Sequence, residues 1–273
     1  MSAGPPAARE LAGRSGDGEL RAVVFDYGHT LLDFAVAEDR MLEAYERVRE
    51  MLAAEAAQEL PGAEAFVEAL TRRIAQEVSE SYARRELEEL DVVDMFDLGL
   101  QTLGFRLSRD MVRAITEIEH RAMASRLEVP EANLDTLREL RAMGLKLGVV
   151  SNAHFLPEMM REDLRRVGIA DLVDDMVFSA EIGVRKPHPA IFLKVLETIS
   201  VPPASALFVG DRLRDDVSGA KALGMRGVLT HEFRQEEIDP DIAVPDAVIR
   251  RLPEVVPLVR RLAGAATGPS REG

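Results

Sequence analysis

The sequence has no cysteine and only four lysines among its 273 residues. Without cysteine, the chain cannot build a disulfide framework, a zinc–thiolate site, an iron–sulfur cluster or a thiol nucleophile. Any chemistry must therefore use carboxylates, hydroxyls, imidazoles, ammonium groups and metal ions. The other 30 basic residues are all Arg, so each lysine can be considered individually: Lys146, Lys186, Lys194 and Lys221.

The sequence also lacks long apolar segments and an excess of positive charge. No segment approaches the roughly 18 consecutive apolar residues of a membrane helix, and the first twenty residues lack the apolar centre of a signal peptide. We therefore expect a cytoplasmic protein without a membrane partner. The 48 acidic and 34 basic residues give a formal charge of −14, which disfavours a nucleic-acid partner and favours a divalent cation. The sequence carries no signal for an oligomeric state.

Short runs of β-branched and apolar residues without a polar face recur along the chain. Residues 21–25 form the clearest run, which is typical of a parallel strand buried on both faces. Similar runs occupy 145–150, 206–209 and 227–229, and weaker ones occupy 176–178 and 247–249. Helical patterns lie between them, at 130–143, 157–167, 189–199 and 216–223. This alternation predicts an α/β fold, a three-layer Rossmann-like parallel sheet with helices on both faces.

The stretch from residue 33 to residue 127 interrupts this alternation because it contains no convincing strand. Apolar residues recur there at helical spacing, for example Tyr45, Val48 and Leu52, which predicts a bundle of about four helices. We expect an α-helical cap at 34–127, inserted into a core of 21–33 and 128–265. Because the insert leaves the sheet at the end of its first strand, it should lie over the ligand edge as a lid.

Both ends of the chain are rich in Gly, Ala, Pro and Ser. We expect a disordered leader at 1–20 and a disordered tail at 266–273.

Polar residues follow several of the predicted strands at the point where each strand ends. Asp26, Ser151 and Asp211 have such positions, and Lys186 lies in a Gly-Val-Arg-Lys-Pro loop. The ends of parallel strands meet at one edge of a sheet, so these side chains should lie close together. Two carboxylates can hold Mg²⁺, while hydroxyl and ammonium groups can bind phosphate oxygens. The pattern predicts phosphoryl transfer.

Four segments in order resemble the motifs of the haloacid dehalogenase superfamily of hydrolases, in the subgroup with a helical cap after the first motif. They are the sequences FDYGHTL at 25–31, VSN at 150–152, VRKP at 184–187 and VGDRLRDDVSGA at 209–220. The resemblance covers about residues 20–265.

The resemblance implies a role for each matching residue. Asp26 would be the nucleophile that forms an aspartyl-phosphate. Lys186 would neutralise charge on the nucleophile and on the phosphoryl group, and three residues would contribute to substrate binding: Thr30, Ser151 and Asn152. Mg²⁺ would be bound by Asp26, the carbonyl oxygen of Gly28 and Asp211, with Asp216, alone or with Asp215, holding a metal-bound water.

The first motif departs from the family pattern at Gly28. Phosphatases of the family usually have a second Asp there, which protonates the leaving group and then activates water. Glycine keeps the carbonyl ligand but cannot transfer a proton, and general acid–base catalysis is worth roughly 100- to 10,000-fold. The departure predicts slow turnover or a substitute group, for which His29 and Asp33 are the nearest candidates.

The leading hypothesis is a Mg²⁺-dependent phosphatase of a small phosphorylated metabolite. The alternative is a catalytically impaired relative that binds a phosphorylated ligand or a partner protein. A dehalogenase of this family works without metal, so the Gly210–Asp211 pair makes that activity a minor alternative. The phosphonate-cleaving branch needs a cap lysine, and this cap has none.

Several other polar residues are expected to have no catalytic role. His154 is interpreted as a loop residue, and His188 as the start of a helix. Four arginines are interpreted as solvated faces of cap helices: Arg72, Arg73, Arg84 and Arg85.

Overall fold

The computed structural model describes residues 19–34, 38–53 and 60–266. Its sheet has six parallel strands in the order β3-β2-β1-β4-β5-β6. These strands are β1 (Ala22–Phe25), β2 (Lys146–Ser151), β3 (Asp175–Phe178), β4 (Ala206–Gly210), β5 (Arg226–Thr230) and β6 (Ala247–Ile249). All six predicted strands are confirmed, including the two weaker ones. The predicted disordered leader and tail lie almost wholly outside the described residues, and Leu20 is already packed in the core.

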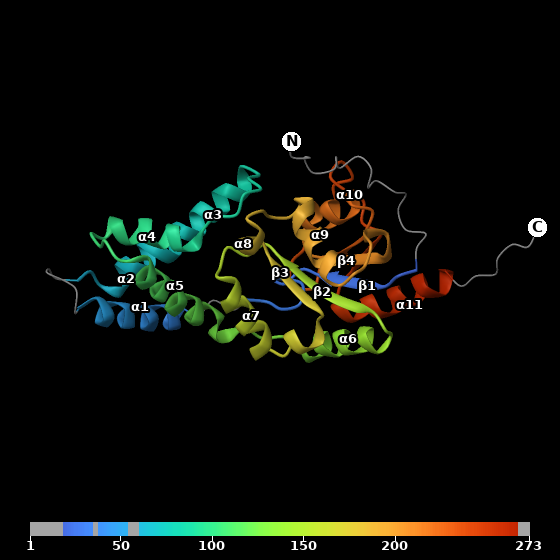
Figure 1. Cartoon of the computed structure of the whole chain (residues 1–273), viewed down its shortest axis with the longest axis horizontal. Helices are drawn as coiled ribbons and strands as arrows, with labels where there is room; N and C mark the ends of the chain where they lie inside the picture. Colours follow the sequence, from blue (N-terminus) through green and yellow to red (C-terminus); the bar gives the residue numbers. More distant parts are fainter. Residues whose placement is uncertain (1–18, 35–37, 54–59, 267–273) are drawn as a thin grey trace, which may run out of the picture.

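Helices cover both faces of the sheet, which explains why its strands are apolar throughout (Figure 1). Val23 and Phe25 pack against one layer, formed by α6 (Glu131–Ala142), α7 (Pro157–Arg166) and α11 (Val255–Ala266). Ala22 and Val24, on the opposite face, pack against α9 (Pro189–Thr198) and α10 (Gly219–Ala222). The three-layer Rossmann-like α/β fold is therefore confirmed.

The helix predicted at 216–223 begins earlier and is irregular. It starts with a π-helical turn, Leu213–Ser218, and continues as α10. The N–H of Val217 donates to the carbonyl of Arg212, which is the wide spacing of a π-helix. The prediction missed this turn because a π-helix has no distinctive apolar period.

A separate group of helices lies between β1 and α6. It comprises α1 (Glu38–Ala53), α2 (Ala63–Phe66) running through a π-helical turn (Val67–Arg72) into α3 (Arg73–Ala83), α4 (Val92–Thr102), and α5 (Arg109–Met123). The described part of 38–123 contains no strand, and its helices bury a core of their own around Tyr45, Phe66 and Phe96. Figure 1 shows them gathered beside the sheet, beyond α7 and α8 (Ser179–Ile182), and not across its faces. The division into core and cap at residues 34 and 127 stays a prediction.

None of the helices in the described ranges has the length and apolar character required to cross a membrane.

A buried ion pair joins the inserted helices to the core. The Arg185 guanidinium lies 2.6 Å from Glu89 Oε1, and the side chains are 1% and 3% exposed. Arg185 also donates to Ser81 Oγ at 2.8 Å and lies over the ring of Tyr82, 4.6 Å from its centroid. The N–H of Arg185 donates to the carbonyl of Leu87. This contact fixes the loop that carries the neighbouring Lys186.

Glu89→Leu should lower the free energy of unfolding by about 3–5 kcal/mol, because it leaves the Arg185 charge buried without its partner. The double variant Arg185→Met/Glu89→Leu should recover part of this loss. The control Glu68→Leu removes an exposed ion pair with Arg72 and should cost less than about 1 kcal/mol. Urea unfolding of the unsubstituted protein and the three variants measures these free energies. Equal losses of unfolding free energy for Glu89→Leu and Glu68→Leu would contradict the prediction.

Candidate active site

Asp26 and Lys186 meet at the carboxyl edge of the sheet. Asp26 directly follows β1, and Lys186 Nζ lies 2.5 Å from Asp26 Oδ1 and 2.7 Å from Asp216 Oδ1. The same ammonium group donates to the carbonyl of Val150 at 2.9 Å. Burial alone would lower the pKa of Lys186, but the charges of Asp216 and Asp26 outweigh burial and raise this pKa above its usual value. Lys186 is therefore a fixed positive charge beside Asp26.

The other predicted phosphate-binding residues surround this pair. Thr30 Oγ1 lies 3.4 Å from Asp26 Oδ2 and donates to it. Ser151 is the last residue of β2 and lines the same cavity as Asp26. Asn152 also lines the cavity, but both ends of its amide bond the backbone of Lys186, at 2.6 and 3.2 Å. This gives Asn152 a positioning role toward the Lys186 loop, and its predicted contact with substrate stays a prediction.

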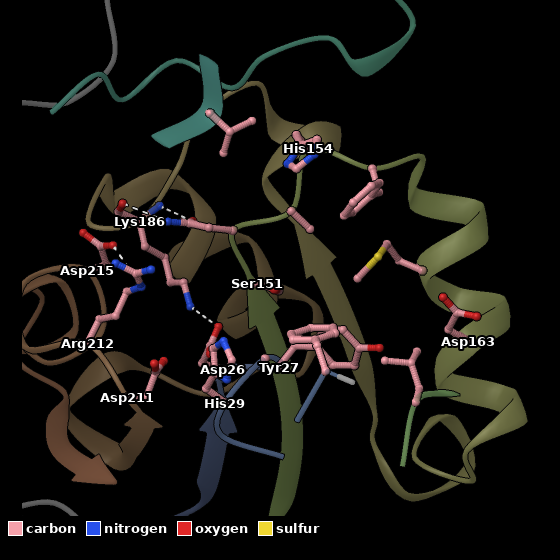
Figure 2. Close-up of a pocket in the computed structure, with 18 of the residues that line it drawn as sticks. Asp26, Tyr27, His29, Ser151, His154, Asp163, Lys186, Asp211, Arg212 and Asp215 are labelled. Carbon is pink, nitrogen blue, oxygen red and sulfur yellow. Dashed lines mark hydrogen bonds and ion pairs between the residues drawn. The ribbon is translucent and has the colours of Figure 1, made fainter. Parts of the chain in front are cut away.

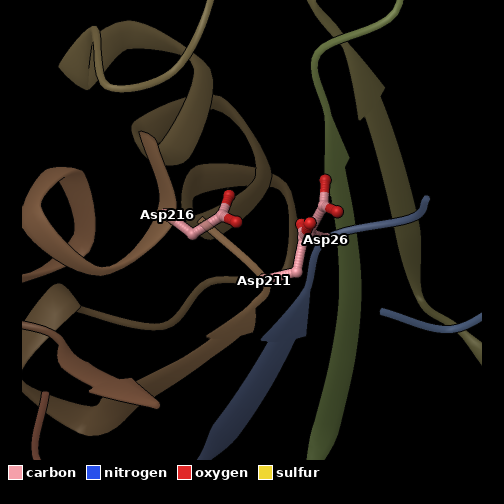
Figure 3. A group of neighbouring side chains, drawn as sticks. All are labelled: Asp26, Asp211 and Asp216. Carbon is pink, nitrogen blue, oxygen red and sulfur yellow. The ribbon is translucent and has the colours of Figure 1, made fainter. Parts of the chain in front are cut away.

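Three carboxylates cluster at this edge of the sheet. Asp26, Asp211 and Asp216 are buried and each offers an oxygen, with these atoms all within 4.8 Å of one another (Figure 3). Burial first, and then the neighbouring carboxylates, raises the pKa of Asp211 to about 8. Burial is also the main cause that raises the pKa of Asp216 to about 6, with a further contribution from the charge of Asp26. Such crowding of hard oxygen ligands fits Mg²⁺.

Local structure explains how Asp216 reaches the cluster. The π-helical turn aims its side chain inward, and the N–H of Arg212 donates to Asp216 Oδ2 at 2.9 Å. Gly210 is required here, because a Cβ at this position would collide with the Asp216 carboxyl group. Asp215 lines the cavity but is absent from the carboxylate cluster; its Oδ2 lies 4.0 Å from Arg212 Nε.

The site opens into a cavity of about 260 Å³ between the sheet edge and the inserted helices (Figure 2). Near Asp26 its wall is charged and includes Arg212 and Arg234. Arg234, whose Nη1 lies 3.0 Å from Asp211 Oδ2, was missed by sequence reasoning, because nothing in the sequence distinguishes it from a solvated Arg. The lining also includes apolar side chains: Val78, Met123, Leu127, Phe155 and Met160.

The space beside Gly28 is filled by an aromatic ring. A Cβ built on Gly28 would lie 2.5 Å from Phe34 Cε2, and the Phe34 ring packs edge-on against the rings of Tyr27 and His29. His29 adopts a left-handed backbone conformation with φ 57°, and its Nδ1 lies 2.8 Å from Asp33 Oδ1. His29 also lines the cavity. A proton-transfer role for His29 or Asp33 stays a prediction, as does the carbonyl-ligand role of Gly28.

The residues expected to have no catalytic role are found in varied surroundings. His154 lines the cavity, and burial lowers its pKa to about 4, so its ring is neutral. His188 precedes α9 and its Nδ1 accepts from the N–H of Ala190. The four cap arginines are exposed, and Arg72 and Arg84 pair with nearby Glu side chains.

Residues 20–224 match the family model described as haloacid dehalogenase-like hydrolase. A glyceraldehyde 3-phosphate phosphatase of Methanopyrus kandleri is 33% identical over 247 residues, covering 89% of this chain and 99% of that protein. A phosphoserine phosphatase of Thermus thermophilus is 37% identical over 120 residues, covering 43% and 47%.

Solved structures show the same fold. A 2-haloacid dehalogenase of Pseudomonas syringae superposes with a TM-score of 0.64 at 24% identity, covering 89% of this chain and 99% of that one. A phosphatase of Thermococcus onnurineus superposes with a TM-score of 0.56 at 25% identity, covering 88% and 98%. The chain is a hydrolase, and it belongs to the haloacid dehalogenase-like family that its motifs predicted.

Mg²⁺ should raise the melting temperature, and the rise should grow between pH 6 and pH 8. Asp211 and Asp216 have raised pKa values in the folded protein, so without metal their contribution to stability is present at acid pH and is lost as the pH rises through these values. Mg²⁺ binds the deprotonated carboxylates and restores stability by mass action. Thermal melts with and without Mg²⁺ at both pH values check this. Asp211→Asn should reduce the Mg²⁺-dependent rise, and the absence of any rise in the unsubstituted protein at pH 8 would contradict the metal site.

Proposed function

We propose that this hydrolase is a Mg²⁺-dependent phosphatase that acts on a small phosphorylated metabolite with Asp26 as nucleophile. The observation that carries this proposal is the burial of Asp26 between the Lys186 ammonium group and a cluster of two further carboxylates. Such a site can hold a phosphoryl group and a divalent cation together against one nucleophilic oxygen. The cytoplasmic location and the absence of a nucleic-acid partner stay predictions from composition.

In the proposed reaction, a carboxylate oxygen of Asp26 attacks phosphorus, and the bond from phosphorus to the leaving oxygen breaks. Lys186 balances the charge of the transferring group, and Thr30 and Ser151 donate hydrogen bonds to its oxygens. Water then attacks the aspartyl-phosphate and releases phosphate, which regenerates Asp26. Asp26, Asp211, Asp216 and the Gly28 carbonyl would hold Mg²⁺, which when bound stabilises negative charge on the phosphoryl oxygens.

Sequence similarity favours phosphatase over dehalogenase chemistry. The relatives described above that share at least 33% identity are phosphatases of small metabolites, whereas the likeness to the 2-haloacid dehalogenase, at 24% identity, concerns the fold. The three-carboxylate cluster also favours the metal-dependent reaction. The alternative of a catalytically impaired binding protein has one specific observation in its favour, because Phe34 fills the space beside Gly28 where an acid would lie.

Asp26→Asn should abolish Mg²⁺-dependent release of phosphate, lowering kcat by at least about 1000-fold, because the amide cannot act as the nucleophile. The measurement is a panel of small phosphate esters with and without Mg²⁺. Asp135→Asn, on the exposed face of α6, is the matched control and should keep the full rate. Substrate binding without turnover across the panel would favour the impaired binding protein.

Gly28→Asp combined with Phe34→Ala should raise kcat by about tenfold or more, because it restores a proton-transfer group beside Asp26 and removes the ring that occupies its space. Gly28→Asp alone should gain less, since the Phe34 ring must first move. Phe34→Ala alone is the control for the loss of the ring. If the double variant folds and binds Mg²⁺ but is no faster than Phe34→Ala, proton transfer does not limit the reaction.

A further inference from the structure

Outside the carboxylate cluster, two residues that line the cavity each carry a buried polar atom with no hydrogen-bond partner among the described residues. These atoms are Tyr27 Oη and His120 Nδ1, on side chains from the sheet edge and from α5. Tyr27 is 2% exposed and His120 is 4% exposed. In Figure 2 the Tyr27 hydroxyl lies on the side away from Asp26 and toward Asp163 of α7. Buried polar atoms without a hydrogen-bond partner are destabilising. A polar group bound beside Tyr27 and His120 would supply the missing partners.

The contact between His120 and Asp163 determines which nitrogen of the His120 ring can accept a hydrogen bond. His120 Nε2 lies 2.7 Å from Asp163 Oδ2. A carboxylate accepts hydrogen bonds, so Nε2 carries the hydrogen; in the Nε2–H tautomer of imidazole, Nδ1 is an acceptor. The Tyr27 hydroxyl can donate a hydrogen bond.

We propose that Tyr27 Oη and His120 Nδ1 bind an uncharged hydroxyl group on the part of the substrate that leaves with the oxygen. This inference rests on the proposed phosphatase function and narrows its substrate class to hydroxyl-bearing phosphate monoesters. A hydroxyl group can donate to an acceptor such as His120 Nδ1 and can also accept from a donor such as Tyr27 Oη.

The surroundings exclude two other kinds of leaving group. A substrate carboxylate would meet the buried Asp163 carboxylate and the acceptor Nδ1, and like charges repel strongly in a buried site. A wholly apolar leaving group would fit the wall formed by Met123, Leu127 and Met160 but would leave both polar atoms unpartnered. Asp163 itself is compensated by Arg166, whose Nη2 lies 3.2 Å from Asp163 Oδ1.

The test compares alkyl phosphates of two to five carbons with the ω-hydroxyalkyl phosphates and the ω-carboxyalkyl phosphates of the same lengths. We expect at least one hydroxyalkyl phosphate to exceed its alkyl counterpart by about tenfold or more in kcat/KM, and the carboxyalkyl esters to be the poorest. Equal values for the hydroxyalkyl and alkyl esters at every length would overturn the inference and leave the phosphatase intact. Hydrolysis of none of these esters, nor of any ester in the wider panel, would count against the phosphatase itself.

Tyr27→Phe removes only the unpartnered oxygen and should bring the ratio of kcat/KM for hydroxyalkyl over alkyl phosphate close to one. His120→Leu, which leaves Asp163 paired with Arg166, should do the same. The matched control is Tyr45→Phe, since the Tyr45 hydroxyl bonds Thr71 inside the helical insert and lies outside the cavity lining. In Tyr45→Phe, the ratio of kcat/KM for hydroxyalkyl over alkyl phosphate should stay unchanged. A purely structural role for Tyr27 predicts an altered melting temperature with an unaltered ratio, and that outcome would refute the inference.

Discussion

The ion pair of Lys186 with Asp26 and Asp216 is the interaction on which the site depends. Three carboxylates within 4.8 Å of one another repel strongly, and one ammonium group 2.5 and 2.7 Å from two of them offsets part of that repulsion. The raised pKa values of Asp211 and Asp216 show that the balance is incomplete. The remaining negative charge would attract a divalent cation, so the imbalance that makes the metal-free site unfavourable would favour a bound metal ion.

The position of Lys186 depends in turn on contacts outside the site. Asn152 bonds its backbone from the end of β2, and the buried Arg185–Glu89 pair connects the adjoining residue to the inserted helices. The packing of these helices against the core and the position of the ammonium group therefore share the same loop. A buried ion pair is stable only when its partners are all in place. The Arg185–Glu89 pair therefore favours a single arrangement of the loop that carries Lys186 when the inserted helices are packed against the core.

The sequence was sufficient to predict the strands and the carboxyl edge, because apolar runs with terminal polar residues follow from burial and topology alone. Asp26, Ser151 and Asp211 were placed in this way, Lys186 and Asp216 were expected at the same edge, and the resemblance implied their roles. Arg185 was not placed, since one Arg among 30 carries no mark of burial. Phe34 and the pair His120–Asp163 were missed for a related reason: their partners are distant in sequence or depend on how a loop folds back, and neither follows from local periodicity.

Gly28 has a physical consequence beyond the loss of a proton carrier. A carboxylate at this position would place a fourth negative charge close to the cluster and would raise the pKa values of Asp211 and Asp216 further. Glycine avoids that repulsion, and the Phe34 ring fills the space beside it. Gly28 therefore removes the acid of the family pattern and at the same time relieves repulsion within the carboxylate cluster.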